Sequence, residues 1–167
     1  APATPTDSPV QRGEQIGRYV GNIRAAQQVT YRLLDYCGEV NPAKRGDVVR
    51  AREEWDKRNL ALVTSWREVV KNWLIADDVA AGDVASTIDE LDVAASQTLE
   101  ALKPAQDELI KRIAAKPPEE RTKTCAILVG LVIGGGRDIR VTSPASMKIY
   151  EKFAPTSSNS AVGGVAH

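Results

Sequence analysis

Hydrophobic side chains recur three or four residues apart along most of the chain, the spacing of one face of an α-helix. The first such stretch, residues 10–37, has its repeating positions at Ile16, Val20, Ile23, Thr30, Leu34 and Cys37. Gly38 follows as a left-handed cap that would end a helix, and Asn41 with Pro42 forms a helix-starting pair. The pattern therefore predicts a first helix that ends before Gly38.

A second stretch runs from Pro42 to about Ile75 with only Gly46 to weaken a helix. Apolar side chains repeat there every seven residues, at Val48, Trp55, Leu62 and Val69. One helix of this length would span about 50 Å at about 1.5 Å per residue, enough to be the spine of a bundle. We therefore predict a single long amphipathic helix.

A third stretch follows a turn around residues 80–82, with Asp83 as the expected N-cap. Its apolar stripe consists of Val84, Ile88, Leu91, Ala95, Leu99 and Leu102. Pro104 interrupts the pattern, but the same stripe continues at Ala105, Leu109 and Ile113. We therefore predict a kinked helix that continues to about Ala115.

Two helix-starting signals mark the C-terminal part of the chain. Pro-Pro-Glu-Glu at 117–120 suits a first helical turn, because proline fits there and carboxylates favour the positive end of the helix dipole. The apolar run 125–133 that follows is too short to cross a membrane, and we predict a helix at the centre of the core, with a buried strand as the alternative. Ser143 and Pro144 then start a short last helix, whose apolar side is Met147, Tyr150 and Phe153.

Length and composition fit one globular domain: 167 residues, 43% of them hydrophobic and 26% charged. The predicted fold class is all-α, an antiparallel bundle of four main helices with a short C-terminal helix and one disulfide. Residues 10–154 would form this domain. Prolines and small residues predict a flexible leader at 1–9, and Ser, Gly and Ala predict a disordered tail at 155–167.

Cys37 and Cys125 are the only cysteines, and they indicate either a structural disulfide in an oxidising compartment or two buried thiols in a reducing one. The leader is typical of a mature exported N-terminus from which a signal peptide has been removed, which favours the disulfide. We therefore expect a periplasmic or secreted protein. A membrane tether through a lipidated cysteine before Ala1 would give the same leader.

Charge and residue types exclude several functions. The 22 basic and 22 acidic side chains balance, so no overall positive field favours nucleic acid. The one histidine, His167, lies in the predicted tail, which leaves no imidazole for a catalytic triad or metal site in the core. Cys-x-x-Cys, Gly-x-Ser-x-Gly and Ser-x-x-Lys motifs are all absent. We therefore expect no metal, no cofactor and no enzymatic activity.

Two other features have a structural and a functional interpretation. Gly-Gly-Gly-Arg at 134–137 resembles a phosphate-binding loop only weakly, and we interpret it as a helix terminator with a flexible link.

Residues 76–110 carry nine carboxylates and one lysine. These carboxylates would pair with basic neighbours in the bundle or form a docking surface for a basic partner.

Arg52, Trp66 and Trp73 share one edge of the second stretch at seven-residue spacing, with Asn59 between them. Tryptophan with arginine is typical of protein interfaces, so these three are candidate partner anchors; the alternative is that both tryptophans belong to the core. We expect a protein-binding module, such as an inhibitor, immunity or assembly accessory protein. A carrier for an apolar small molecule or lipid is the second hypothesis, and an enzyme without a histidine-based site is the third.

Overall fold

The computed structural model describes residues 8–155, and every regular element in that part of the chain is a helix. In chain order the elements are α1 (Pro9–Val40), the 3-10 turn η1 (Pro42–Lys44), α2 (Arg45–Thr64), α3 (Trp66–Ala76), α4 (Ala81–Ala114), α5 (Pro118–Ile133), α6 (Ile139–Thr142) and α7 (Pro144–Phe153). This confirms the predicted all-α class. Most of the predicted leader, residues 1–7, and all but the first residue of the predicted tail lie outside the described residues.

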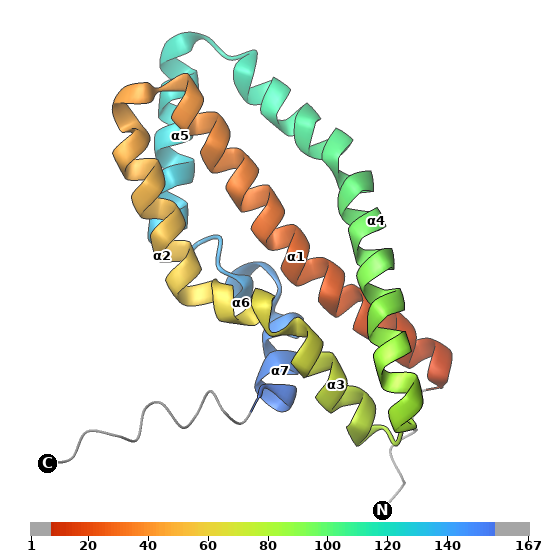
Figure 1. The fold of residues 1–167 in the computed structure, drawn as a ribbon. Coiled ribbons are helices and arrows are strands. Elements are labelled where there is room, and N and C mark those ends of the chain that lie inside the picture. The colour runs from red at the N-terminus through yellow and green to blue at the C-terminus, as the bar shows by residue number, and fades with distance from the viewer. Residues whose placement is uncertain (1–7, 156–167) are drawn as a thin grey trace, which may run out of the picture.

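Helix α1 runs through the middle of the molecule, with α4 along one side and α2 and α5 on the other (Figure 1). Except at the bend between α2 and α3, each long helix runs antiparallel to the one before it (Figure 1). As a result α4 returns parallel to α1, and α5 lies parallel to α2. The core follows α1 and includes the fully buried side chains of Tyr19, Ile23, Trp55 and Ile139.

The N-terminus of α1 is fixed by local hydrogen bonds. The Ser8 hydroxyl accepts the backbone N–H of Gln11 at 3.2 Å, and the Gln11 side chain accepts the backbone N–H of Ser8 at 2.8 Å. This reciprocal cap, with Pro9 in the first turn, starts the helix one residue before the expected domain boundary.

Gly38 does not cap α1 as expected, because the helix continues to Val40. The glycine is buried where α1 meets α2, and a Cβ placed on it would lie 3.7 Å from the Val48 side chain. That distance is an ordinary van der Waals contact, so Gly38 neither ends the helix nor is required by tight packing at this position.

The predicted single helix over residues 42–75 is wrong, because the chain bends at Ser65 between α2 and α3 (Figure 1). Two hydroxyl groups bond back to carbonyls of the preceding turn: Thr64 to Leu60 at 2.9 Å and Ser65 to Ala61 at 2.5 Å. Such bonds compete with the helical ladder and bend helices. The bend lets α2 pack on α5 and α3 pack on α4 and α7.

Helix α4 includes Pro104 and continues to Ala114, which confirms the predicted continuation. It begins at Ala81, so Asp83 lies in the first turn and is not the N-cap. The carbonyl of Asp83 accepts the hydroxyl groups of Ser86 and Thr87.

Helix α5 forms over the apolar run, but its predicted place at the centre of the core is wrong. Cys125, Val129 and Val132 are buried, whereas Ile127 is 64% and Leu131 46% exposed. The helix lies at the edge of the molecule against α1 and α2, which cover one side of it (Figure 1). Within residues 8–155, no helix is both long and apolar enough to span a membrane.

Candidate functional site

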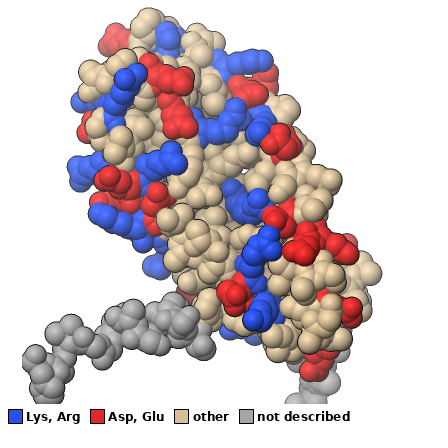
Figure 2. All heavy atoms as spheres, viewed as in Figure 1, with Lys and Arg blue, Asp and Glu red and all other residues tan. Residues whose placement is uncertain are grey.

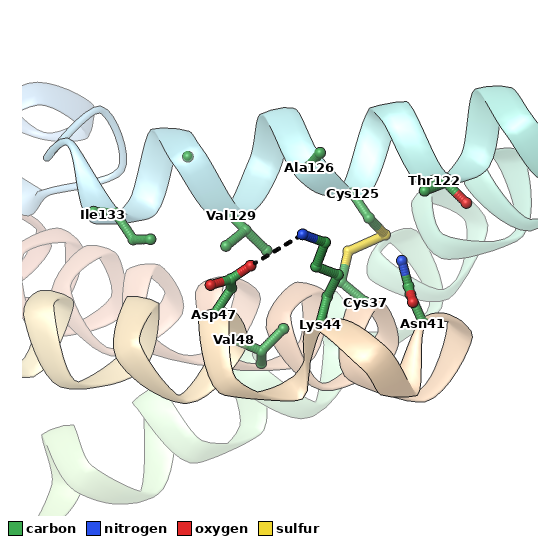
Figure 3. Close-up of a pocket in the computed structure, with 11 residues that line it drawn as sticks. Cys37, Asn41, Lys44, Asp47, Val48, Thr122, Cys125, Ala126, Val129 and Ile133 are labelled. Atoms are coloured by element: carbon green, nitrogen blue, oxygen red, sulfur yellow. Dashed lines mark ion pairs between the residues drawn. A yellow bond between two sulfur atoms is a disulfide. The ribbon is translucent and has the colours of Figure 1, made fainter.

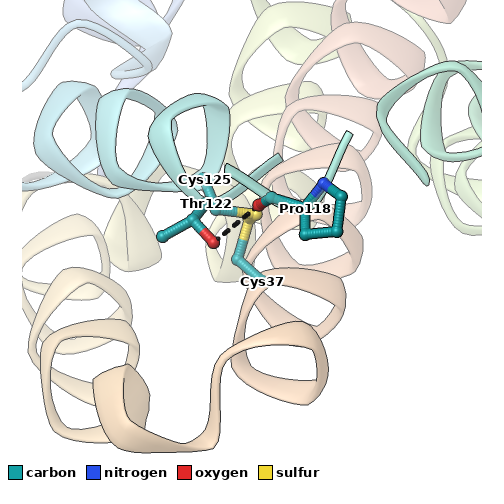
Figure 4. The surroundings of a disulfide bond; sticks show 4 residues. All are labelled: Cys37, Pro118, Thr122 and Cys125. Carbon is teal, nitrogen blue, oxygen red and sulfur yellow. Dashed lines mark hydrogen bonds between the residues drawn. A yellow bond between two sulfur atoms is a disulfide. The ribbon is translucent and has the colours of Figure 1, made fainter. Parts of the chain in front are cut away.

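A disulfide joins the last turns of α1 to the first half of α5. The Sγ atoms of Cys37 and Cys125 lie 2.17 Å apart and their Cα atoms 5.4 Å apart (Figure 4). Beside the bond, the Thr122 hydroxyl donates to the Pro118 carbonyl at 3.0 Å, within the first turns of α5. The predicted pairing of these two cysteines is confirmed.

A groove of about 300 Å³ lies beside this disulfide, between α2 and α5 (Figure 3). Its lining is mainly apolar: Val48, Ala126, Val129, Ile133 and the two cysteines. Polar side chains stand around it, and Lys44 Nζ lies 3.7 Å from an Asp47 carboxylate oxygen. Both of these charged groups are more than half exposed, so their ion pair contributes little stability.

The outer side of α5 extends this apolar surface. Ala126 and Gly130 line the groove, and Ile127 and Leu131 follow them around the exposed side of the helix. A Cβ placed on Gly130 would have no neighbour within 4 Å in the described part of the chain, so the helix backbone is open to close approach there. We call Ala126, Ile127, Gly130 and Leu131 the α5 face.

The glycines after α5 end the helix and do not form a phosphate cradle. The N–H groups of Gly135 and Gly136 donate to the carbonyls of Val132 and Leu131, and Gly135 has a φ of 88°. A Cβ on Gly136 would lie only 3.0 Å from Leu131 Cδ2. Because these backbone donors bond back to α5, the interpretation as a helix terminator is confirmed.

A partly buried polar network then fixes the segment after the glycines against α2. Arg58 Nε donates to Asp138 at 2.7 Å, and a terminal guanidinium nitrogen of Arg58 donates to the Val132 carbonyl at 2.6 Å. Trp55 Nε1 donates to the Arg137 carbonyl at 3.0 Å. Because these polar groups are paired with one another, the network serves the fold.

The candidate anchors Arg52, Trp66 and Trp73 do not share one exposed surface. The Arg52 guanidinium lies 3.8 Å from the centre of the Tyr31 ring. Both tryptophans are 7% exposed, and Trp73 stacks on Phe153 with ring centres 5.3 Å apart. Partner binding by these three residues stays a prediction, and the burial of both indoles favours the alternative that they are core residues.

The acidic stretch is paired with basic neighbours at several positions. Asp92 accepts Arg24 of α1 at 2.8 Å and Arg67 of α3 at 2.5 Å, and Asp107 pairs with Arg32 of α1. These contacts join α4 to two helices and favour the structural interpretation of its charge.

Two tyrosines, Tyr19 and Tyr31, have pKa values raised above the ordinary value for a tyrosine. Burial raises the pKa of Tyr19, with the nearby Tyr150 as a lesser cause. Burial and a hydrogen bond to Asp56 raise the pKa of Tyr31. Among residues 8–155, no three His, Cys, Asp or Glu side chains are grouped to hold a metal ion.

Comparisons with protein-family models, curated proteins and solved structures give no match to this chain. The groove and the α5 face are therefore the features of the molecule that bear on its function. Sequence reasoning missed this surface because an all-round apolar helix is normally buried. The small residues Ala126 and Gly130, four positions apart, were the available signal of an open side.

Proposed function

We propose that this chain is an exported protein-binding module that uses the α5 face and the adjoining groove to bind an apolar helix of another protein. The exposure of Ile127 and Leu131 within the apolar run carries the proposal. Exposed apolar side chains that continue into a groove are typical of interaction sites. An amphipathic helix laid into an apolar groove is a recurring mode of recognition.

The distribution of polar groups supports this use. Lys44, Asp47 and Lys123 surround the apolar centre, and each is more than half exposed. Protein interfaces commonly have such an apolar centre with a polar rim. The absence of a Cβ at Gly130 would let a partner's side chain, or its backbone, approach α5 closely.

A protein partner fits this site better than a small apolar ligand. The groove has about 300 Å³, at the lower end of the about 300–1,000 Å³ typical of small-molecule sites, and it is open along α5. A ligand in the groove would leave Ile127 and Leu131 exposed, whereas a helix across the α5 face would cover them. Export is supported by the Cys37–Cys125 disulfide, a bond that persists in oxidising compartments.

The test is site-specific photo-crosslinking in the native envelope or culture fluid. A photoreactive phenylalanine at position 127 should crosslink one protein reproducibly, and the same group at Val93, which is 60% exposed on α4, should not. The double variant Ile127→Glu/Leu131→Glu should fail to capture that protein while its melting temperature stays close to that of wild type. Equal capture by wild type and double variant, or no crosslink from position 127, would reject the proposal.

A further inference from the structure

A second groove, separate from the α5 face, lies between α1 and α4 and has a volume of about 420 Å³. The surface is visibly hollowed between these two helices (Figure 2). Its apolar walls are Ala25, Ala26 and Val29 from α1 and Leu102, Ala105 and Leu109 from α4. Because alanines stand on both facing helices, side chains do not fill the space between them, and Leu109 remains 42% exposed.

One charged side chain lines this groove among the described residues, that of Arg137. Its Nε is buried without a hydrogen-bond acceptor, and Arg137 has no ion pair within residues 8–155. Its backbone is held in place, because the Trp55 indole donates to its carbonyl. The guanidinium therefore has no carboxylate of the described chain to balance its charge, and an anion brought into the groove by a ligand would supply one.

Two arginines of α1, Arg24 and Arg32, differ from Arg137 because their guanidinium groups already have partners. Arg24 is bonded to Asp92, and Arg32 to Asp107 and Gln106, so both are already paired with α4. The hydroxyl groups at the same end of the groove are also engaged: Thr142 donates to the Asp138 carbonyl, and Ser143 bonds to Ser146. Arg137 is therefore the group left to receive an anion.

We propose that this groove binds a medium-chain aliphatic monocarboxylate, with the carboxylate on Arg137 and the hydrocarbon chain between Ala26 and Ala105. A guanidinium presents parallel N–H donors that match the two oxygens of a carboxylate. Because Arg137 carries one positive charge, a ligand with one negative charge would neutralise it. The volume lies at the lower end of the range for small-molecule sites, which suits one chain rather than the two of a phospholipid. This site is independent of the protein-binding proposal.

The experiment compares decanoate with decanol at pH 7.5 by isothermal titration calorimetry. Wild type should bind decanoate at least tenfold more tightly than decanol. Arg137→Gln should lose this preference. The matched control is Arg140→Gln, because Arg140 is exposed, lies three residues away and has no ion pair within the described residues; it should bind like wild type.

A filling variant tests the apolar part of the site. Ala105→Trp should reduce decanoate binding at least tenfold, because the indole would occupy the space between α1 and α4. Thermal melts check that each variant is folded, and if Ala105→Trp is not, the pair Arg137→Gln and Arg140→Gln decides. No binding of decanoate to wild type, equal binding of acid and alcohol, or full affinity in Arg137→Gln would each overturn the proposal.

Discussion

The side chain of Asn59 on α2 holds the start of α6: its Oδ1 accepts the backbone N–H of Ile139 at 2.9 Å. Its Nδ2 donates to the Trp55 carbonyl at 2.8 Å and to an Asp138 carboxylate oxygen at 3.0 Å. Asn59 is 2% exposed, so these bonds replace the water that the amide loses on folding. Asn59, which lies in the heptad series of Arg52, Trp66 and Trp73, thus joins segments 80 residues apart.

Replacing this amide with an apolar group of similar size should be strongly destabilising. Asn59→Leu leaves the Ile139 N–H unpaired and removes one partner of Asp138, so we expect a loss of about 2–3 kcal/mol in the free energy of unfolding. Urea denaturation followed by circular dichroism measures it. Asn22→Leu, at an exposed position on α1, is the control and should change stability by less than about 0.5 kcal/mol. A loss below about 1 kcal/mol for Asn59→Leu would show that the network contributes little.

The disulfide should contribute substantially to stability. Cys37 and Cys125 are 88 residues apart, and in the chain-entropy model a loop of this size stabilises the fold by up to about 4–5 kcal/mol. The variant Cys37→Ser/Cys125→Ser should therefore have a melting temperature well below that of the oxidised protein. Reduction of wild type should also lower its melting temperature. Thiol counting on denatured, unreduced protein should find no free thiol; two free thiols would contradict the bond and weaken the export argument.

Truncation of the two candidate anchor tryptophans should affect stability rather than binding. Trp66 and Trp73 are almost fully buried, so Trp66→Ala and Trp73→Ala should each cost about 3–5 kcal/mol of folding stability. Chemical denaturation gives the stability, and the affinity for the crosslinked partner is measured on the folded fraction. A large loss of affinity with unchanged stability would restore the anchor hypothesis for these residues.

Tyr19 should make the protein sensitive to alkaline pH. Burial raises its folded-state pKa above the ordinary value of about 10, so the stability from keeping it protonated is present below pH 10 and is lost as pH rises further. Its hydroxyl is buried without a hydrogen-bond partner among residues 8–155, so Tyr19→Phe should be at least as stable as wild type at pH 7.

Urea titrations at pH 7 and pH 10.5 test this expectation. The stability difference between Tyr19→Phe and wild type should grow at the higher pH in favour of the variant. Tyr31→Phe is the comparison, because it removes a hydrogen bond to Asp56 and should lower stability already at pH 7. An identical pH dependence for Tyr19→Phe and wild type would be inconsistent with the raised pKa.

The helix starts at Pro118 and Pro144 were predictable because their signals are local: each proline lies in the first turn of the helix that it starts. The start of α1 at Pro9 was not predicted, because Ser8 and Pro9 were assigned to the leader, and the predicted N-cap Asp83 lies inside the first turn of α4. The bend at Ser65 was not predictable from periodicity, because the apolar repeat continues through it and both halves face the core. Hydroxyl bonds to the preceding turn, which need no change in the repeat, accompany that bend.

The candidate sites depended on information that periodicity does not contain. The apolar run of α5 specifies a helix but not which neighbours cover it, so Ile127 and Leu131 were assigned to the core. The second groove depends on Ala26 and Ala105, 79 positions apart, facing each other across two helices. Only the arrangement of α1 and α4 brings them together.

Because the bend at Ser65 directs α2 against α5 and α3 against α4 and α7, we expect two units that share α1 to open separately. One unit contains α2, α5 and the disulfide, whereas the other contains α3, the first part of α4 and α7, with no covalent cross-link among its described residues. Amide hydrogen exchange should therefore resolve two opening free energies along the length of α1. Reduction of the disulfide would lower the protection of the first unit and leave the second close to its original rate.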